Sequence, residues 1–186
     1  MKKSIGRLFF KLMGWKFDFS LPLKDIPKCV LVAAPHTSNW DFFYAIFAFW
    51  YLEIPMRFFI KDSYTKPWYG FIFRKLGAIG IDRSQRKNMV DFGAETLINS
   101  KHLYMLNTPE GTRARVDKWK TGFYFMAEKA QVPILLAYCD YEKKISGIGR
   151  IVGIKNRSRE DVLTEIEEYY KDIKGKYPEN YNPKIF

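Results

Sequence analysis

Histidine and cysteine are scarce in this sequence, with only two residues of each among 186. Cys29 and Cys139 both lie inside apolar runs, and two such cysteines provide neither a disulfide framework nor the paired spacing of a metal site. We therefore expect two buried, reduced thiols and no bound metal. His36 and His102 are then the only imidazoles available for acid–base chemistry.

Long hydrophobic runs are also missing. The longest, Phe42 to Leu52, is about half of the ~20 residues that a membrane-spanning helix needs. The start, "MKKSIGRLFFKLMGW", is basic, but its apolar core is short and no small-residue cleavage site follows, as a signal peptide would require. With no linker, repeat or low-complexity block either, we expect a single domain over residues 1–186 and no membrane crossing.

Positive charge and aromatic side chains are abundant. Lys and Arg outnumber Asp and Glu by 31 to 20, and the chain has 16 Phe, 12 Tyr and 5 Trp. A net charge of +11 calls for an anionic partner such as nucleic acid, a phospholipid surface or an acidic protein. Aromatics beside Lys and Arg favour a membrane interface. They cluster in apolar runs such as "FFYAIFAFWY", which weighs against a nucleic-acid-binding module that stacks bases.

The segment from Lys2 to Trp15 has the pattern of an amphipathic helix. Apolar residues recur at helical spacing, and Lys and Arg occupy the remaining positions. Two interpretations stay open at this point: a helix docked on the protein's own core, or one lying in a lipid interface with its basic side toward anionic headgroups.

Strand and helix patterns alternate along the rest of the chain. Apolar runs typical of strands occur at residues 29–34, 56–60, 78–81, 102–106 and 132–139, with a weaker one at 149–154. Helical patterns occur at residues 39–51, 66–77, 86–99, 121–130 and 158–174, the first capped by Ser38 or Asn39 and the last by Ser158. This alternation predicts an α/β fold with a mostly parallel central sheet flanked by helices.

Charged side chains follow four of these strands. Ligands of open α/β sheets bind beyond the carboxyl ends of the strands, so groups placed there should meet at one edge of the sheet. The groups in question are His36 and Asp41, Lys61 and Asp62, Asp82 and Arg83, and Glu110 and Arg113. We expect a functional site at this edge.

His36 is the strongest candidate for a general base. Asp41 falls in the first turn of the following helix, where it is favoured by the helix dipole and could hold one imidazole nitrogen, leaving the other free to accept a proton. The alternative is that Asp41 is simply a favourable first-turn residue. No serine or cysteine has the setting of an enzyme nucleophile, so we expect a substrate hydroxyl to attack directly.

The segment "TPEGTRAR" could bind an anion. Gly111 permits a sharp turn or close backbone approach, Arg113 offers a planar fork suited to phosphate, and Thr112 could add a hydrogen bond. Arg83 could contribute from the neighbouring strand end. A plain surface turn with a Glu–Arg pair is the alternative.

Taken together, these segments resemble the lysophosphatidate acyltransferase (1-acylglycerol-3-phosphate O-acyltransferase) family of glycerolipid acyltransferases. "HTSNWD" looks like its His-x4-Asp block, "GAIGIDR" its Gly-x3-Ile-x-Arg block, "PEGTR" its third block and, weakly, "VPILLA" its fourth. The blocks occur in the family's order over about residues 30–140. The chain departs from the family pattern at Thr108 and Leu136, positions that could line the acyl or acceptor pocket.

The resemblance implies roles for individual residues. His36 would be the base and Asp41 would orient it, while Arg83 and Arg113 hold an acceptor phosphate. Glu110, with Gly111 and Thr112, would shape the third-block loop. We add Lys61 to the substrate-binding residues from its strand-end position.

The implied reaction moves an acyl chain from acyl-CoA or acyl-carrier protein to a lysophospholipid, most simply lysophosphatidate, in phospholipid biosynthesis. No cofactor is expected beyond that co-substrate. Residues 1–20 would be a membrane-facing segment, 28–140 the catalytic core blocks and 158–175 a C-terminal helix of a peripheral protein on the cytoplasmic face of a membrane. An amino-acid lipid or sugar acceptor, a catalytically inactive lipid-binding relative and a nucleic-acid-binding module remain the alternatives.

Overall fold

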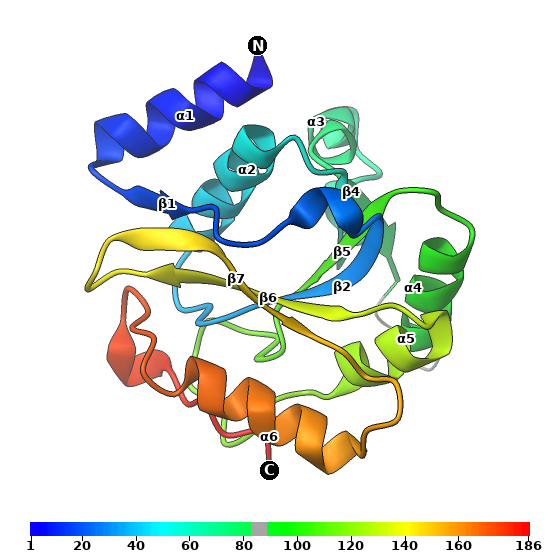
Figure 1. Ribbon diagram of the computed structural model, residues 1–186. Coiled ribbons are helices and arrows are strands. Elements are labelled where there is room, and N and C mark those ends of the chain that lie inside the picture. Colours follow the sequence, from blue (N-terminus) through cyan, green and yellow to red (C-terminus); the bar gives the residue numbers. More distant parts are fainter. Residues whose placement is uncertain (83–88) are drawn as a thin grey trace.

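A computed structural model describes residues 1–82 and 89–186 of the chain (Figure 1). Within these ranges the strands form one seven-stranded sheet in the order β1-β7-β6-β2-β5-β3-β4. The strands are β1 (Lys16–Asp18), β2 (Lys28–Ala33), β3 (Met56–Lys61), β4 (Ala78–Ile81), β5 (Leu103–Asn107), β6 (Ile134–Asp140) and β7 (Ile145–Val152). The α-helices are α1 (Lys2–Met13), α2 (Trp40–Leu52), α3 (Gly70–Lys75), α4 (Met89–Ile98), α5 (Gly122–Ala130) and α6 (Arg159–Tyr170). Short 3-10 turns lie at Leu23–Asp25, Asp62–Tyr64 and Pro178–Asn180.

The sheet is mostly parallel. Among the described strands, only the β6–β7 pair is antiparallel, and a tight connection after Asp140 joins these two. The pairs β2–β5, β2–β6, β3–β5, β3–β4 and β1–β7 are parallel. Parallel strands covered on both faces are nearly continuous apolar runs, and residues 29 to 32 of β2 are completely buried. The expected α/β fold with a mostly parallel sheet is confirmed.

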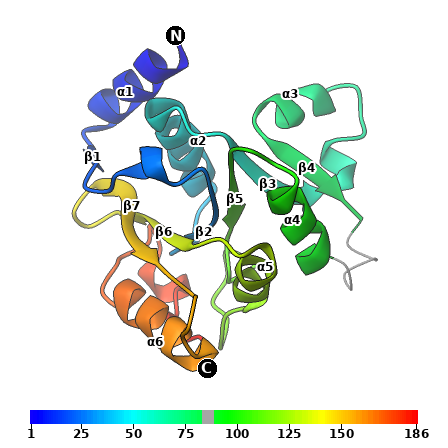
Figure 2. The same ribbon diagram turned by 45° about the vertical axis from the view of Figure 1, so that its right-hand side comes forward.

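Alternation along β2 divides the core into two layers. Val30 and Val32 face the layer beneath α4, α5 and α6, whereas Cys29 and Leu31 face the layer beneath α2 and α3. Figures 1 and 2 both place α6 on the opposite side of the sheet from α1 and α2. The expectation of two buried thiols holds for Cys29, which is fully buried, but not for Cys139, which is only partly buried because it lines a pocket.

Helix α1 packs on α2 rather than on the sheet. Gly6 makes the close crossing possible, because a Cβ at this position would lie 2.5 Å from the backbone oxygen of Phe47. Between the two helices, Phe10, Trp15 and Tyr44 form a buried aromatic cluster, in which Phe10 is 2% exposed. The N-terminal helix is therefore docked on the protein, the first of the two arrangements considered from sequence.

The outer side of α1 nevertheless remains apolar. Ile5, Leu8 and Leu12 recur at helical spacing and are 42%, 54% and 77% exposed. Lys3, Arg7 and Lys11 lie along one flank of this stripe, and Lys3 pairs with Glu53 at 2.8 Å. No helix within residues 1–82 and 89–186 is long and apolar enough to cross a bilayer.

Some element boundaries differ from those expected. The helix predicted from residue 66 begins only at Gly70, because Pro67 first forms a turn whose carbonyl accepts a hydrogen bond from the Gly70 amide at 2.8 Å. Strand β7 is longer than the predicted 149–154 and begins at Ile145, while β1 was not predicted at all. Helix α6 is capped as predicted, with the Ser158 hydroxyl accepting from the Asp161 amide at 3.0 Å.

Candidate active site

The carboxyl ends of four parallel strands meet at one edge of the sheet. His36 follows β2, Glu110 follows β5, Lys61 ends β3 and Asp82 follows β4, and these strands are neighbours in the order β2-β5-β3-β4. The topology therefore confirms that the four charged strand ends share an edge. Arg83, the remaining predicted binding residue, lies outside the described residues.

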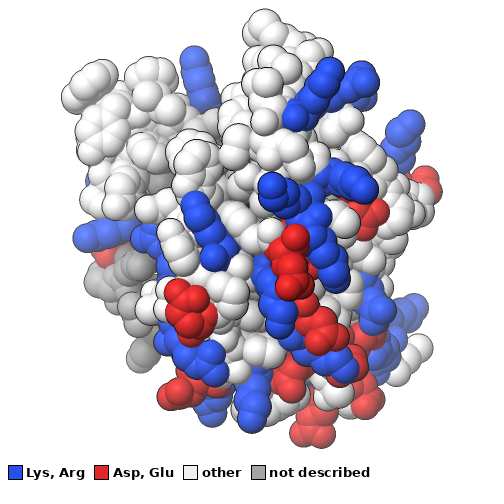
Figure 3. All heavy atoms as spheres, turned by 90° about the vertical axis from the view of Figure 1, so that its left-hand side faces the viewer, with Lys and Arg blue, Asp and Glu red and all other residues white. Residues whose placement is uncertain are grey.

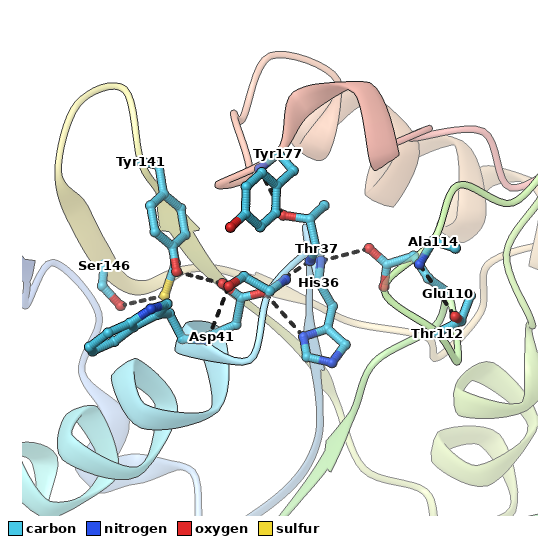
Figure 4. A network of polar contacts seen from close by, with 12 residues as sticks. His36, Thr37, Asp41, Glu110, Thr112, Ala114, Tyr141, Ser146 and Tyr177 are labelled. Atoms are coloured by element: carbon cyan, nitrogen blue, oxygen red, sulfur yellow. Dashed lines mark hydrogen bonds and ion pairs between the residues drawn. The ribbon is translucent and has the colours of Figure 1, made fainter.

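His36 and Asp41 form a pair at this edge (Figure 4). Nδ1 of His36 lies 3.2 Å from Oδ2 of Asp41, and the two side chains are 23% and 9% exposed. The five-residue separation places Asp41 in the first turn of α2, from which its carboxylate points back toward the imidazole. This geometry leaves Nε2 of His36 free to face the pocket and exchange a proton.

The Asp41 carboxylate also holds the loop that precedes its helix. Oδ2 accepts hydrogen bonds from the backbone amides of Thr37 and Ser38, both at 2.9 Å. Oδ1 accepts a hydrogen bond from the Tyr141 hydroxyl at 2.6 Å. Of the two predicted caps, Asn39 is the N-cap residue but makes no side-chain cap bond. The Ser38 hydroxyl accepts a 3.2 Å hydrogen bond from the amide of Trp40, the first residue of α2. The nearby carboxylate satisfies the loop amides more strongly because it is charged.

Glu110 joins the third-block loop to the histidine loop. Its Oε1 accepts a hydrogen bond from the backbone amide of His36 at 2.9 Å, and the residue is 4% exposed. Its other oxygen, Oε2, is buried without a hydrogen-bond partner among the described residues. Burial raises the pKa of Glu110 above its ordinary value, although the bond from His36 opposes that rise. Glu110 therefore holds the backbone of the candidate base in place from behind the site.

The loop after Glu110 presents its polar groups to the pocket. Gly111 adopts φ +68°, a left-handed conformation that other residues rarely adopt. A Cβ there would lie 2.8 Å from Nζ of Lys120. Thr112 and Arg113 follow on the exposed part of the loop, and neither Arg113 nor Lys120 forms an ion pair with any residue the structure describes. Lys120 was not predicted from sequence, because nothing in "KWKTG" distinguishes it from a solvated lysine.

A pocket of about 980 Å³ opens beside His36. Because β2 is the middle strand, the lining divides into two sides. On the β5–β3–β4 side the basic residues Lys61, Arg113 and Lys120 line it together with apolar residues such as Phe58 and Ile60. On the β6–β7 side, beneath α2, the lining is mostly small and apolar, and it consists of Ala45, Ala48, Phe49, Ala137, Gly147, Ile148 and their neighbours. Thr108 lines the pocket, as expected, whereas Leu136 is fully buried in the core and does not line it.

The C-terminal segment closes over both functional loops. The Tyr177 amide donates to Oγ1 of Thr37 at 3.2 Å, and Trp119 Nε1 donates to the carbonyl of Asn182 at 2.8 Å. Arg115 Nη1 donates to the carbonyl of Tyr181 at 2.5 Å. None of these contacts was predicted, because their partners are 60 to 140 residues apart and no local pattern reports them.

Comparisons with known proteins agree with this site. The sequence model of the Acyltransferase family matches residues 23–139, which include both members of the His36–Asp41 pair and the loop from Glu110 to Arg113. Comparison with individual curated sequences gives no match. Among solved structures, the chain is similar to the crystal structure of the 1-acyl-sn-glycerophosphate (LPA) acyltransferase PlsC from Thermotoga maritima. The TM-score is 0.60 at 22% sequence identity, and the match covers 91% of this chain and 75% of PlsC.

At this identity the likeness to PlsC establishes a shared fold. The family match covers well over half of the chain and confirms the resemblance that the His-x4-Asp and "PEGTR" blocks had indicated. The sequence, the fold and the arrangement of the strand-end residues lead to the same conclusion: the chain belongs to the Acyltransferase family and is an acyltransferase.

Proposed function

We propose that this protein transfers a fatty acyl chain from a thioester donor, acyl-CoA or acyl-carrier protein, to the hydroxyl of a lysophospholipid at a membrane surface. Lysophosphatidate is the acceptor that the pocket favours. The observation that supports this most directly is the His36–Asp41 pair in a largely apolar pocket whose β5–β3–β4 side also carries three cations.

The basic side suits the acceptor's phosphate. Lys61 ends β3, and Arg113 and Lys120 come from the loop after β5, so three positive charges from two segments line the same side of the pocket. Arginine binds phosphate through parallel N–H donors, and lysine adds a mobile point charge. The family resemblance adds Arg83, which follows β4 in sequence and lies outside the described residues, to the proposed phosphate-binding residues.

The apolar side suits an acyl chain. Ala45, Ala48 and Ala137 leave room between α2 and the sheet, and Phe49 and Ile148 provide bulkier walls. A saturated chain placed there would exchange water for apolar contacts, worth about 0.8 kcal/mol per methylene. A thioester carbonyl at the inner end of such a chain would then lie near His36.

Proton transfer follows from the orientation of the imidazole. Nε2 of His36 removes the proton of the acceptor hydroxyl as its oxygen attacks the thioester carbonyl carbon, and Asp41 stabilises the imidazolium that forms. The tetrahedral intermediate collapses with cleavage of the carbon–sulfur bond. His36 returns the proton to the departing thiolate, so the enzyme ends in its starting state.

The surface around α1 suits a lipid interface. Figure 3 shows that mostly uncharged atoms cover the upper part of this face, with Lys and Arg beside them, while most of the Asp and Glu lie lower. Trp68, which precedes α3, is 85% exposed, and Phe71 and Ile72 of α3 are also exposed. Exposed aliphatic and aromatic side chains flanked by cations are typical of proteins that lie on anionic membranes.

Thiol release tests the reaction directly. Purified protein would be assayed with acyl-CoA, and separately with acyl-carrier protein, in mixed micelles with and without lysophosphatidate. We expect acceptor-dependent release that His36→Ala abolishes and His102→Ala preserves, because His102 is exposed at the opposite end of β5. No release with either donor, from folded protein, would contradict the proposed reaction with this acceptor.

Acceptor selectivity tests the basic side of the pocket. Lysophosphatidate would be compared with a monoacylglycerol, which lacks the phosphate, and with amino-acid lipid and sugar acceptors. Arg113→Gln and Lys61→Gln should each raise the KM for lysophosphatidate by roughly 10-fold, the effect of a lost charge-assisted hydrogen bond. Lys101→Gln, on the far edge of the sheet, provides the matched control. Equal rates with and without the phosphate would point to a different acceptor.

A further inference from the structure

Tyr141 reaches the Asp41 carboxylate from outside the segments that supply the other site residues. It lies in the turn between β6 and β7, 100 residues from Asp41, and its hydroxyl donates to Oδ1 at 2.6 Å (Figure 4). Oδ1 is the carboxylate oxygen that faces away from the imidazole, because His36 and the two backbone amides all contact Oδ2. The two oxygens of Asp41 therefore have separate partners.

The ring of Tyr141 is held rigidly behind this bond. It packs edge-on against Trp15, with ring centroids 4.9 Å apart, and against Tyr44 at 5.7 Å. Its backbone amide donates to the carbonyl of Lys174 at 2.9 Å. Fixed at both ends, the side chain directs its hydroxyl toward one position, and the Asp41 carboxylate occupies it.

The electrostatic surroundings keep Tyr141 a neutral donor. Burial raises the pKa of its phenol above the ordinary value, and the hydrogen bond to Asp41 and that carboxylate's charge raise it further. Burial likewise raises the pKa of Tyr44 and of Cys139, each to about 12, so both neighbours are neutral near pH 7. The charge of Asp41 is thus met on one side by a neutral hydroxyl and on the other by the imidazole.

We propose that Tyr141 is a positioning residue for acyl transfer: its hydroxyl fixes the rotation of the Asp41 carboxylate so that Oδ2 stays aligned with Nδ1 of His36. Without this donor the carboxylate would keep its bonds from the Thr37 and Ser38 amides but lose the anchor on its second oxygen. The imidazole would then spend less time in the tautomer and orientation that leave Nε2 free to accept a proton. This inference rests on the proposed function, in which His36 is the base.

Kinetics of Tyr141→Phe test the role. We expect kcat to fall roughly 10-fold, with KM for acceptor and donor changed less than about two-fold, because Tyr141 is not among the residues that line the pocket. Tyr51→Phe is the matched control, since Tyr51 belongs to the same aromatic cluster but makes no hydrogen bond to Asp41 among the described residues. It should retain the wild-type kcat.

A double-mutant cycle separates positioning from a structural role. In an Asp41→Asn background, Tyr141→Phe should lower kcat by less than about two-fold further, because its partner is already altered. An equal loss in both backgrounds would show that Tyr141 does not act through Asp41 and would overturn the proposal.

A spectroscopic measurement does not depend on turnover. In protein labelled with 15N-histidine, His36→Ala assigns the two imidazoles, and the nitrogen shifts report which ring nitrogen carries the proton. Wild type and Tyr51→Phe should show the proton held on Nδ1, and Tyr141→Phe should shift toward the mixture of tautomers of a free imidazole. Identical shifts in all three proteins would overturn the proposal, even if transferase activity is confirmed. A changed pattern in a protein that is inactive with lysophosphatidate would support it and reject only the acceptor.

Discussion

The proposed membrane association predicts that replacing Ile5, Leu8 and Leu12 with glutamine weakens binding to lipid vesicles while leaving the fold intact. The three side chains form the exposed stripe of α1, whereas Gly6 and Phe10 on its inner side make the contacts that dock the helix. Glutamine is a good helix former, so α1 should persist. The substitution removes apolar surface without touching the basic flank.

The expected loss of membrane-binding free energy follows from the exposed fractions of Ile5, Leu8 and Leu12, which are 42%, 54% and 77%. Together these fractions equal about 1.7 fully exposed aliphatic side chains. Covering one such side chain with lipid contributes ~2 kcal/mol to the free energy of membrane binding. The triple variant should therefore bind more weakly by about 3.5 kcal/mol, or roughly 300-fold in partition coefficient. The Lys and Arg residues beside the stripe should still contribute about 1 kcal/mol each to binding anionic vesicles, and this part should weaken as salt is added.

The assay is sedimentation with vesicles that contain anionic phospholipid, at about 0.15 M salt, where distant charges are screened. A triple variant at Ile98, Phe125 and Ile151, also to glutamine, provides the matched control. These side chains are 49%, 40% and 37% exposed and belong to α4, α5 and β7. Figures 1 and 2 show α4 and α5 away from α1. We expect the control to bind like wild type.

Two results would refute the reasoning. If the α1 variant bound vesicles within two-fold of wild type, the stripe would not be the lipid-facing surface. If both triple variants lost binding equally, vesicle binding would depend on the total exposed apolar area and not on its position on α1. Circular dichroism and thermal unfolding of each variant would establish that the fold is retained.

Three further outcomes follow from the structure. Burial raises the pKa of Glu110 above its ordinary 4.5, so the wild-type protein should lose stability as pH rises through that raised pKa. Glu110→Gln cannot ionise and should not show this loss. The difference in Tm between the two proteins should therefore grow from about pH 4 to pH 7. A pH-independent difference would show that Glu110 does not titrate there. Gly6→Leu should lower Tm, since its Cβ would overlap the Phe47 carbonyl, and an unchanged Tm would mean that α1 is not tightly docked. Ser158→Ala should cost about 1 kcal/mol and lower Tm by roughly 2–4 °C through loss of the α6 cap, whereas Ser158→Asp should restore it.

Much of the fold could be predicted because its strands are buried on both faces. Runs such as that of β2 are apolar throughout, and helices with clear periodicity separate them, so a parallel sheet was the natural expectation. β1 could not be predicted, since three residues give too short a pattern. The start of β7 was missed because Gly147 weakens the apolar run that marks a strand.

The sequence predicts those parts of the site whose residues are close together along the chain. Asp41 lies within one turn of a helix start, so its reach toward His36 could be inferred from spacing alone. The partner of its second oxygen could not, because Tyr141 is distant in sequence and its surroundings resemble any β-turn. Lys120 was missed for the same reason, since only folding brings it against Gly111.

The segments that close around the His36–Asp41 pair lie outside the region shared with the family. The family match ends at residue 139, yet Trp15, Tyr141 and the Tyr177 amide all contact the loop or the residues that hold it. Evolution could therefore retune catalysis in this lineage without changing any residue of the common blocks. Two relatives with identical blocks could work at different rates, and sequence comparison restricted to residues 23–139 would not reveal why.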